Sequence, residues 1–70
     1  MAEVRAEMVA NVWKVVVAEG AQVDDGDTLV ILESMKMEIP VLAESAGTVT
    51  KLHVNEGDVV QEGDLIAIIG

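Results

Sequence analysis

The sequence predicts an all-β fold, in which two small antiparallel sheets form a flattened barrel or sandwich with an internal pseudo-two-fold axis. β-branched residues are abundant, with 13 Val, five Ile and three Thr among 70 residues, and such side chains favour strands over helices. The two halves of the chain repeat each other in sequence. Glycine turn signals separate short apolar segments at regular spacing, as in sandwiches and small barrels.

The repeat aligns residues 1–33 with residues 38–70 without a gap, and 12 of the 33 aligned pairs are identical. The identical pairs include the turn glycines: Gly20 with Gly57, and Gly26 with Gly63. Coincidence in a valine-rich chain does not easily place glycines in register. We therefore expect one domain over residues 1–70, in which the halves superpose and residues 34–37 join them at a unique position.

Each half contains the same elements in the same order. A short apolar stretch and a small residue precede a longer strand, which ends at a Glu-Gly turn; a very short apolar segment, a Gly-Asp turn and a final strand follow. The longer apolar segments, expected as strands, are 4–8, 12–17 and 28–33 in the first half, and 39–43, 49–54 and 65–69 in the second.

The longer strand of each half does not alternate simply between apolar and polar residues. Val12 is out of phase with Val15 and Val17, and the second half repeats this offset. One extra residue in each strand would restore the phase, so a β-bulge is expected in both.

Net charge and composition exclude several classes of function. Thirteen acidic residues against four basic ones give a formal charge of −9, which repels phosphate backbones and argues against nucleic-acid binding. No apolar run approaches the ~18 residues of a membrane span, and the start of the chain lacks the features of a secretory signal. Cysteine is absent, so no disulfide or thiolate metal site is expected. A cytoplasmic protein that meets basic partner surfaces is the expectation.

The join between the halves predicts a hairpin. Residues 31–40 contain two apolar segments around a short polar centre, with Lys36 at the tip of the turn and Pro40 suited to an edge strand. By itself, a lysine at a turn is ordinarily a solvated surface residue.

Residues 33–38, Glu-Ser-Met-Lys-Met-Glu, resemble the attachment motif of the biotinyl domain family. The resemblance extends over essentially the whole chain and is greatest to small stand-alone biotin/lipoyl attachment proteins. It implies that a biotin protein ligase couples biotin to Lys36, and that Met35, Met37 and Glu33 help the ligase to recognise the site. Glu33 and Glu38 could also be read as an acid–base pair, but nothing else in the sequence builds a pocket; they serve recognition or are simply solvated.

The same resemblance implies a biotin carboxyl carrier without an active site of its own. Biotin on Lys36 would move carboxyl groups between a biotin carboxylase and a carboxyltransferase. The alternative is a lipoyl carrier, or a domain that accepts both biotin and lipoate, although lipoyl domains usually have Asp-Lys-Ala where this chain has Met-Lys-Met. A third hypothesis is an unmodified interaction domain.

The repeat and the family resemblance also predict the environment of three further residues. His53 aligns with Val16 in the repeat, which indicates a surface strand residue rather than a ligand. Trp13 aligns with Thr50, so it is expected to cover apolar surface. Ala10 lies where biotinyl domains often have glycine, and it would be strained if this turn required positive φ.

Overall fold

The computed structural model describes residues 1–70 and contains eight strands and no helix. In chain order the strands are β1 (Ala2–Arg5), β2 (Ala10–Val15), β3 (Gln22–Val23), β4 (Thr28–Ser34), β5 (Met37–Leu42), β6 (Gly47–Leu52), β7 (Val59–Val60) and β8 (Leu65–Ile69). The all-β prediction is confirmed, and the structure holds no helix that could cross a bilayer.

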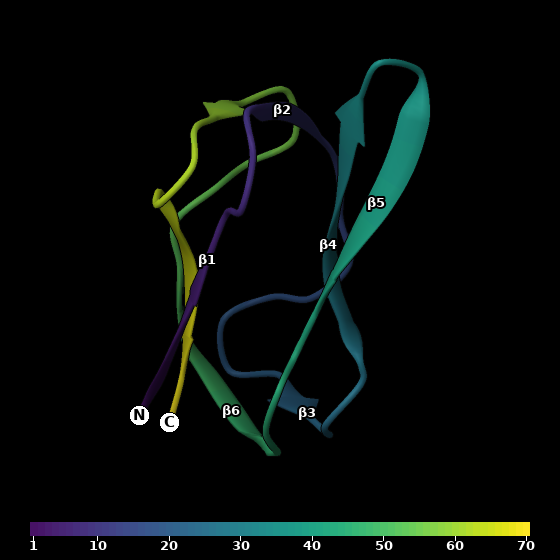
Figure 1. Ribbon diagram of the computed structural model, residues 1–70. Coiled ribbons are helices and arrows are strands. Elements are labelled where there is room, and N and C mark those ends of the chain that lie inside the picture. The colour runs from purple at the N-terminus through teal and green to yellow at the C-terminus, as the bar shows by residue number, and fades with distance from the viewer.

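The strands form two four-stranded sheets, with the orders β1-β8-β6-β3 and β5-β4-β2-β7. Every pairing between neighbouring strands is antiparallel. Each sheet contains strands from both halves of the chain, and the two sheets face each other (Figure 1). Strands β2 and β3 map onto β6 and β7 residue by residue when the numbering is shifted by 37 (38 minus 1), so the sequence repeat is also a repeat of the fold.

Several strand ends differ from the predicted ones. Strand β2 ends at Val15 and β6 at Leu52, two residues before the ends of the apolar segments. Val54 lies beyond β6 and is still buried in the core. Apolar residues therefore mark burial, whereas the hydrogen-bond ladder sets the strand ends.

Both predicted bulges are present. The register between β2 and β4 shifts between Val12 and Lys14, and the register between β6 and β8 shifts between Val49 and Lys51. The extra residue is Trp13 in one strand and Thr50 in the other. The bulges restore the phase of the buried valines, as the sequence indicated.

The four turn glycines all have positive φ, between 90° and 95°, which glycine adopts without steric cost. The aspartate after the second glycine of each half closes its turn. The Oδ2 atom of Asp27 accepts a hydrogen bond from the Asp24 amide at 2.8 Å, and Asp64 does the same for the Gln61 amide at 2.9 Å. The Gly-Asp pairs are therefore turn-forming residues.

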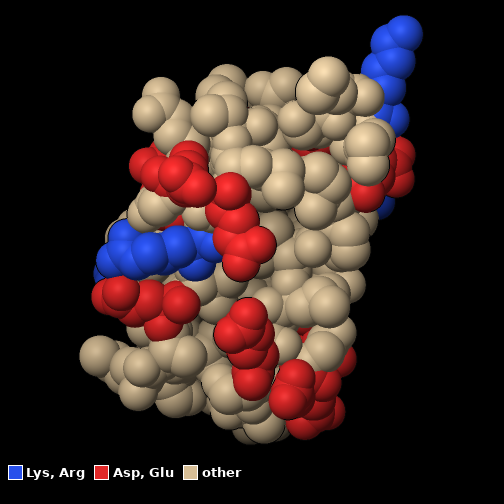
Figure 2. Space-filling view, in the orientation of Figure 1, with Lys and Arg blue, Asp and Glu red and all other residues tan.

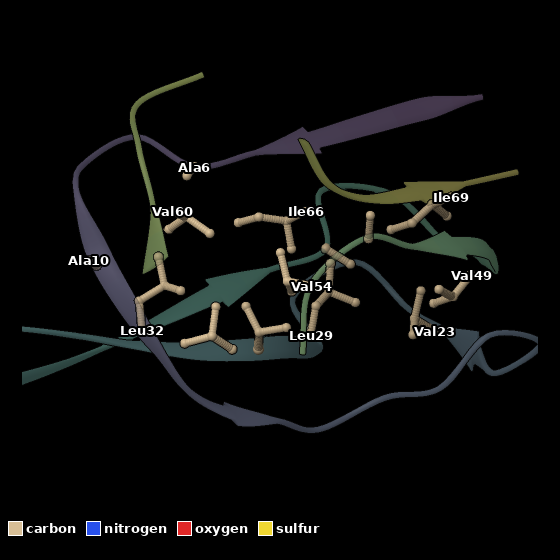
Figure 3. Packing of buried hydrophobic residues seen from close by; sticks show 14 residues of the cluster. Ala6, Ala10, Val23, Leu29, Leu32, Val49, Val54, Val60, Ile66 and Ile69 are labelled. Carbon is tan, nitrogen blue, oxygen red and sulfur yellow. The ribbon is translucent and has the colours of Figure 1, made fainter. Parts of the chain in front are cut away.

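The core lies between the sheets and is wholly aliphatic (Figure 3). It contains 14 buried residues and no buried polar side chain. Residues that align in the repeat are buried alike: Leu29 with Ile66, and Leu32 with Ile69. Each half contributes equivalent side chains, so the two halves complete one core.

Neither Ala10 nor Gly47 has positive φ, so the strain considered for Ala10 does not arise. Glycine is required at position 47 for a different reason, because a Cβ there would lie 2.7 Å from Cγ2 of Ile69 and 2.9 Å from the carbonyl oxygen of Gly70. In the other half the residue aligned with Ile69 is Leu32, which has no Cγ2 methyl. Ala10 accordingly fits, and it is buried.

The molecule is elongated, with extents of 31 × 17 × 17 Å. The two chain ends lie side by side because β1 pairs with β8, Ala2 opposite Ile69. The β4–β5 hairpin extends at the opposite end of the molecule (Figure 1). Both termini therefore lie away from the hairpin that carries Lys36.

Candidate cofactor-attachment site

The hairpin that carries Lys36 closes with a two-residue loop. Strands β4 and β5 remain paired as far as Ser34 opposite Met37, which leaves only Met35 and Lys36 between them. Their φ angles are 53° and 66°. Positive φ at both central residues is what a type I′ hairpin turn requires.

This backbone is unfavourable for the residues that adopt it. Met35 and Lys36 are the only residues other than glycine with positive φ in the chain. Type I′ turns prefer Asn-Gly, and a side chain in this region costs on the order of 1–3 kcal/mol. The strands hold the turn in place, since β4 is paired on both sides and Val30 and Leu32 are buried. The strain therefore falls on the residue proposed for chemistry and its neighbour.

Lys36 is fully available to another protein. Its side chain is exposed and takes part in no hydrogen bond or ion pair; the one ion pair joins Arg5 Nη2 to Glu3 Oε1 at 2.8 Å, on β1. A basic side chain extends beyond the body at the end where the β4–β5 turn lies (Figure 2). Lys14 and Lys51, in contrast, lie within β2 and β6, so their side chains project from the surface of a sheet and not from a hairpin tip.

The methionines on either side of Lys36 do not fill the core. Met35 is 91% exposed and Met37 is 63% exposed. The common role of methionine as a filler of core gaps is therefore excluded here. Two flexible apolar side chains in solvent suit contact with a partner.

Glu33 and Glu38 form a directly opposed cross-strand pair at the base of the turn. Like charges in this position are unfavourable for the sheet. Neither carboxylate faces a cavity, since the main groove runs between β1 and β5 and includes none of residues 33–38. No group of His, Cys, Asp or Glu is arranged to hold a metal ion. The structure therefore gives the two carboxylates no substrate pocket to line.

The remaining candidates are surface residues. His53 is exposed directly after β6, and its backbone amide bonds the Ile66 carbonyl oxygen at 2.8 Å. Trp13 occupies the bulge of β2 and is 47% exposed. The tight turn was predicted from sequence, but the left-handed backbone at Met35 and Lys36 was not; a two-residue loop between paired strands is the signal that could have revealed it.

Comparison with known proteins agrees with this geometry. Residues 2–69 match the family described as biotin-requiring enzymes, whose model is that of the biotin/lipoyl domain. The chain belongs to this family. The chain is 67% identical over 67 residues to the biotinylated protein TB7.3 homolog of Mycobacterium leprae, and this alignment covers 96% of this chain and 94% of that one. It is 48% identical over 49 residues to the biotin/lipoyl attachment protein of Bacillus subtilis, covering 70% of this chain and 67% of that one.

Solved structures of the biotin-requiring family show the same architecture. The crystal structure of the Kluyveromyces lactis urea carboxylase superposes with a TM-score of 0.92 and 39% identity, covering 99% of this chain. The matched region is only 6% of that carboxylase. The predicted family and fold are thereby confirmed.

Proposed function

We propose that Lys36 is the attachment residue of this biotin carrier, and that the loaded domain moves carboxyl groups between a biotin carboxylase and a carboxyltransferase. The observation that carries the proposal is an exposed, unpartnered lysine at the tip of a rigid hairpin. Membership of the biotin-requiring family supports biotin as the cofactor. Relatives named as biotinylated proteins, and a biotin-dependent acyl-coenzyme A carboxylase subunit of M. leprae that is 53% identical over 51 residues, support the carboxylase partners.

In attachment, the deprotonated Lys36 Nζ atom attacks the carboxyl carbon of biotin that the ligase has activated with ATP. The C–N amide bond forms as the bond to the activating group breaks, and the side chain loses its positive charge. The formal charge of the chain would change from −9 to −10. The lysine side chain and the acid chain of biotin together span about ten bonds, a reach on the order of 12 Å. When attached, biotin is the group that holds the carboxyl.

The chain's own contribution is placement. The paired strands fix the position of Lys36, and its exposed side chain supplies the free movement of the arm. No metal-binding group lies beside Lys36, and the main groove includes none of residues 33–38, so we assign activation of biotin to a biotin protein ligase and the carboxyl chemistry to the partner enzymes. Loading by such a ligase consumes ATP, which supports a cytoplasmic location.

Acceptance of lipoate is a second candidate function. The observation in its favour is the 48% identity to a protein described as a biotin/lipoyl attachment protein. The Met-Lys-Met sequence around Lys36 favours biotin over lipoate, because the resemblance to lipoyl domains would call for Asp-Lys-Ala.

Intact mass of the protein isolated from its native host tests the proposal. We expect a mass increase equal to one biotinyl group, located on the peptide that contains Lys36. An increase equal to a lipoyl group would establish the second candidate, and an unmodified mass would contradict both.

A further inference from the structure

Three exposed apolar side chains form a patch on the outer face of β2 and β7. Val9, Trp13 and Val59 are 63%, 47% and 65% exposed. The buried pair Ala10–Val60 points inward, so the next pair, Asn11 with Val59, points outward. Val9, which directly precedes β2, and the bulge residue Trp13 lie two positions before and after Asn11. We call Val9, Trp13 and Val59 the shoulder patch.

The shoulder patch lies beside the base of the lysine hairpin. Asn11 pairs with Val59 on one side and with Glu33 on the other. Neighbouring strands are about 4.8 Å apart, so Val59 lies roughly 10 Å from Glu33 across the sheet. Glu33 in turn precedes Lys36 by three residues. A protein that encloses the tip of the hairpin therefore comes within reach of the patch.

The other half of the molecule provides an internal control. Under the repeat, the patch residues align with Ala46, Thr50 and Gln22, which are small or polar. Gln22 and Ala46 border a shallow hollow on the sheet edge near the chain ends. Because the same fold is built there with small or polar side chains at these positions, packing does not require the three exposed apolar residues, and their grouping near Lys36 is the feature that needs an explanation.

We propose that the shoulder patch is a docking surface for the biotin protein ligase, an inference that rests on the proposed function. Of the enzymes that handle a carrier, the ligase alone must bring its reacting group to the Lys36 Nζ atom, about 6 Å from the Cα atom. Enzymes that receive the loaded arm meet its end at about twice that distance. The ligase therefore approaches the hairpin base most closely and covers the surface next to it.

Acidic residues border the patch on two sides. Glu33 and Glu38 lie toward the hairpin, and Glu56 and Asp58 lie toward β7. Glu56 Oε2 accepts a hydrogen bond from the Val15 amide at 3.3 Å, and the Asp58 carbonyl oxygen accepts one from the Val12 amide at 2.7 Å, which holds this segment against β2. The complementary ligase surface is apolar at its centre with basic side chains around it.

The test replaces each patch residue by the residue that the other half uses: Val9→Ala, Trp13→Thr and Val59→Gln in one chain. Steady-state biotinylation by the ligase is expected to lose at least tenfold in kcat/KM, mainly through KM, which corresponds to about 1.4 kcal/mol of binding. The matched control is Val16→His, which also replaces a half-exposed valine by its counterpart but lies beyond the end of β2. The control is expected to be biotinylated as the wild type is, and Trp13→Thr alone gives a second patch variant.

A second assay separates the ligase from the other partners. Wild-type and variant chains that are already biotinylated are compared as substrates of the carboxylase, and equal rates are expected. Unchanged ligase kinetics in a triple variant with a normal thermal melt would overturn the proposal, as would a defect confined to the carboxylase step. Failure of the proposed function looks different, since the wild-type chain would then accept no biotin on Lys36 at all.

Discussion

The two ends of the molecule have equivalent strand pairings, but a turn joins the paired strands at only one of them. At one end β4 and β5 remain paired up to Ser34 and Met37, and a two-residue turn closes them. At the other end β8 and β1 pair in the equivalent register, Ile69 opposite Ala2, and no turn joins them. The lysine end also has the exposed Met35 and Met37 and the shoulder patch, while the residues that align with the shoulder patch in the other half are small or polar.

This difference indicates that the pairing of the strands does not depend on the turn at Met35 and Lys36. The β8–β1 ladder forms without a connection, so Met35 and Lys36 are not needed to align the sheet. The strand pairing therefore does not require the strained backbone or the two exposed methionine side chains at this end. Four substitution experiments can break or sharpen this comparison.

The core is where the two halves should behave alike. Leu29→Ala and Ile66→Ala each remove a fully buried side chain at equivalent positions. Each is expected to lower the free energy of unfolding by about 2–5 kcal/mol, a large part of the total for a domain of this size. Urea denaturation measures both. A loss below 1 kcal/mol for one of them would show that the halves do not share the core equally.

The small residues before the bulged strands should respond unequally. Gly47→Ala places a methyl group 2.7 Å from Ile69 Cγ2 and is expected to destabilise the protein by about 1–3 kcal/mol. The reverse change in the other half, Ala10→Gly, adds backbone freedom in a strand and should cost about 0.5–1 kcal/mol. Thermal melting of both variants checks the order, and equal losses would contradict the packing explanation.

The methionines beside Lys36 should affect modification and leave stability unchanged. In Met35→Asp with Met37→Ala, a carboxylate replaces an apolar contact with the ligase, so biotinylation should slow at least tenfold, or about 1.4 kcal/mol. The measurement compares rates with biotin ligase and lipoate ligase, with circular dichroism as the control for folding. Normal biotinylation of the folded variant would mean that the position of the hairpin alone selects Lys36.

The smallest effect is expected from relief of turn strain. Met35→Gly removes the side chain from a residue with φ of 53°, which should stabilise the fold by about 0.5 kcal/mol after the greater freedom of glycine in the unfolded chain is subtracted. Chemical denaturation resolves such a change when the wild type is measured in parallel. A clear loss of stability would show that Met35 packs on the domain after all.

Much of the architecture could be predicted from sequence because the two halves of the chain repeat the same pattern of strands and turns. The in-register glycines located the turns, and the phase error at Val12 and Val49 located the bulges. The attachment hairpin followed from its place between the halves. In each case two matching patterns supported one structural interpretation.

What could not be predicted depends on contacts between residues that lie far apart in the sequence. The need for glycine at position 47 arises from Ile69 and Gly70, which are far from it in sequence. The shoulder patch arises because β7 pairs with β2 and places Val59 beside Asn11, 48 residues earlier in the chain. Sequence periodicity contains no information about such neighbours until the strand order is known.

The central claim is that Lys36, and no other amine, receives biotin. Lys36→Arg keeps the positive charge but presents a guanidinium that stays protonated and cannot act as the nucleophile. Because the tip is exposed, stability should change by no more than about 0.5 kcal/mol. The matched control is Lys51→Arg, on the surface of β6.

The decisive measurement is intact mass after incubation of both variants with ligase, biotin and ATP, supported by streptavidin blotting and a thermal melt. The account predicts one biotinyl group on Lys51→Arg and none on a folded Lys36→Arg chain. A biotinyl group retained by Lys36→Arg would contradict the account and assign attachment to Lys14, Lys51 or the amino terminus.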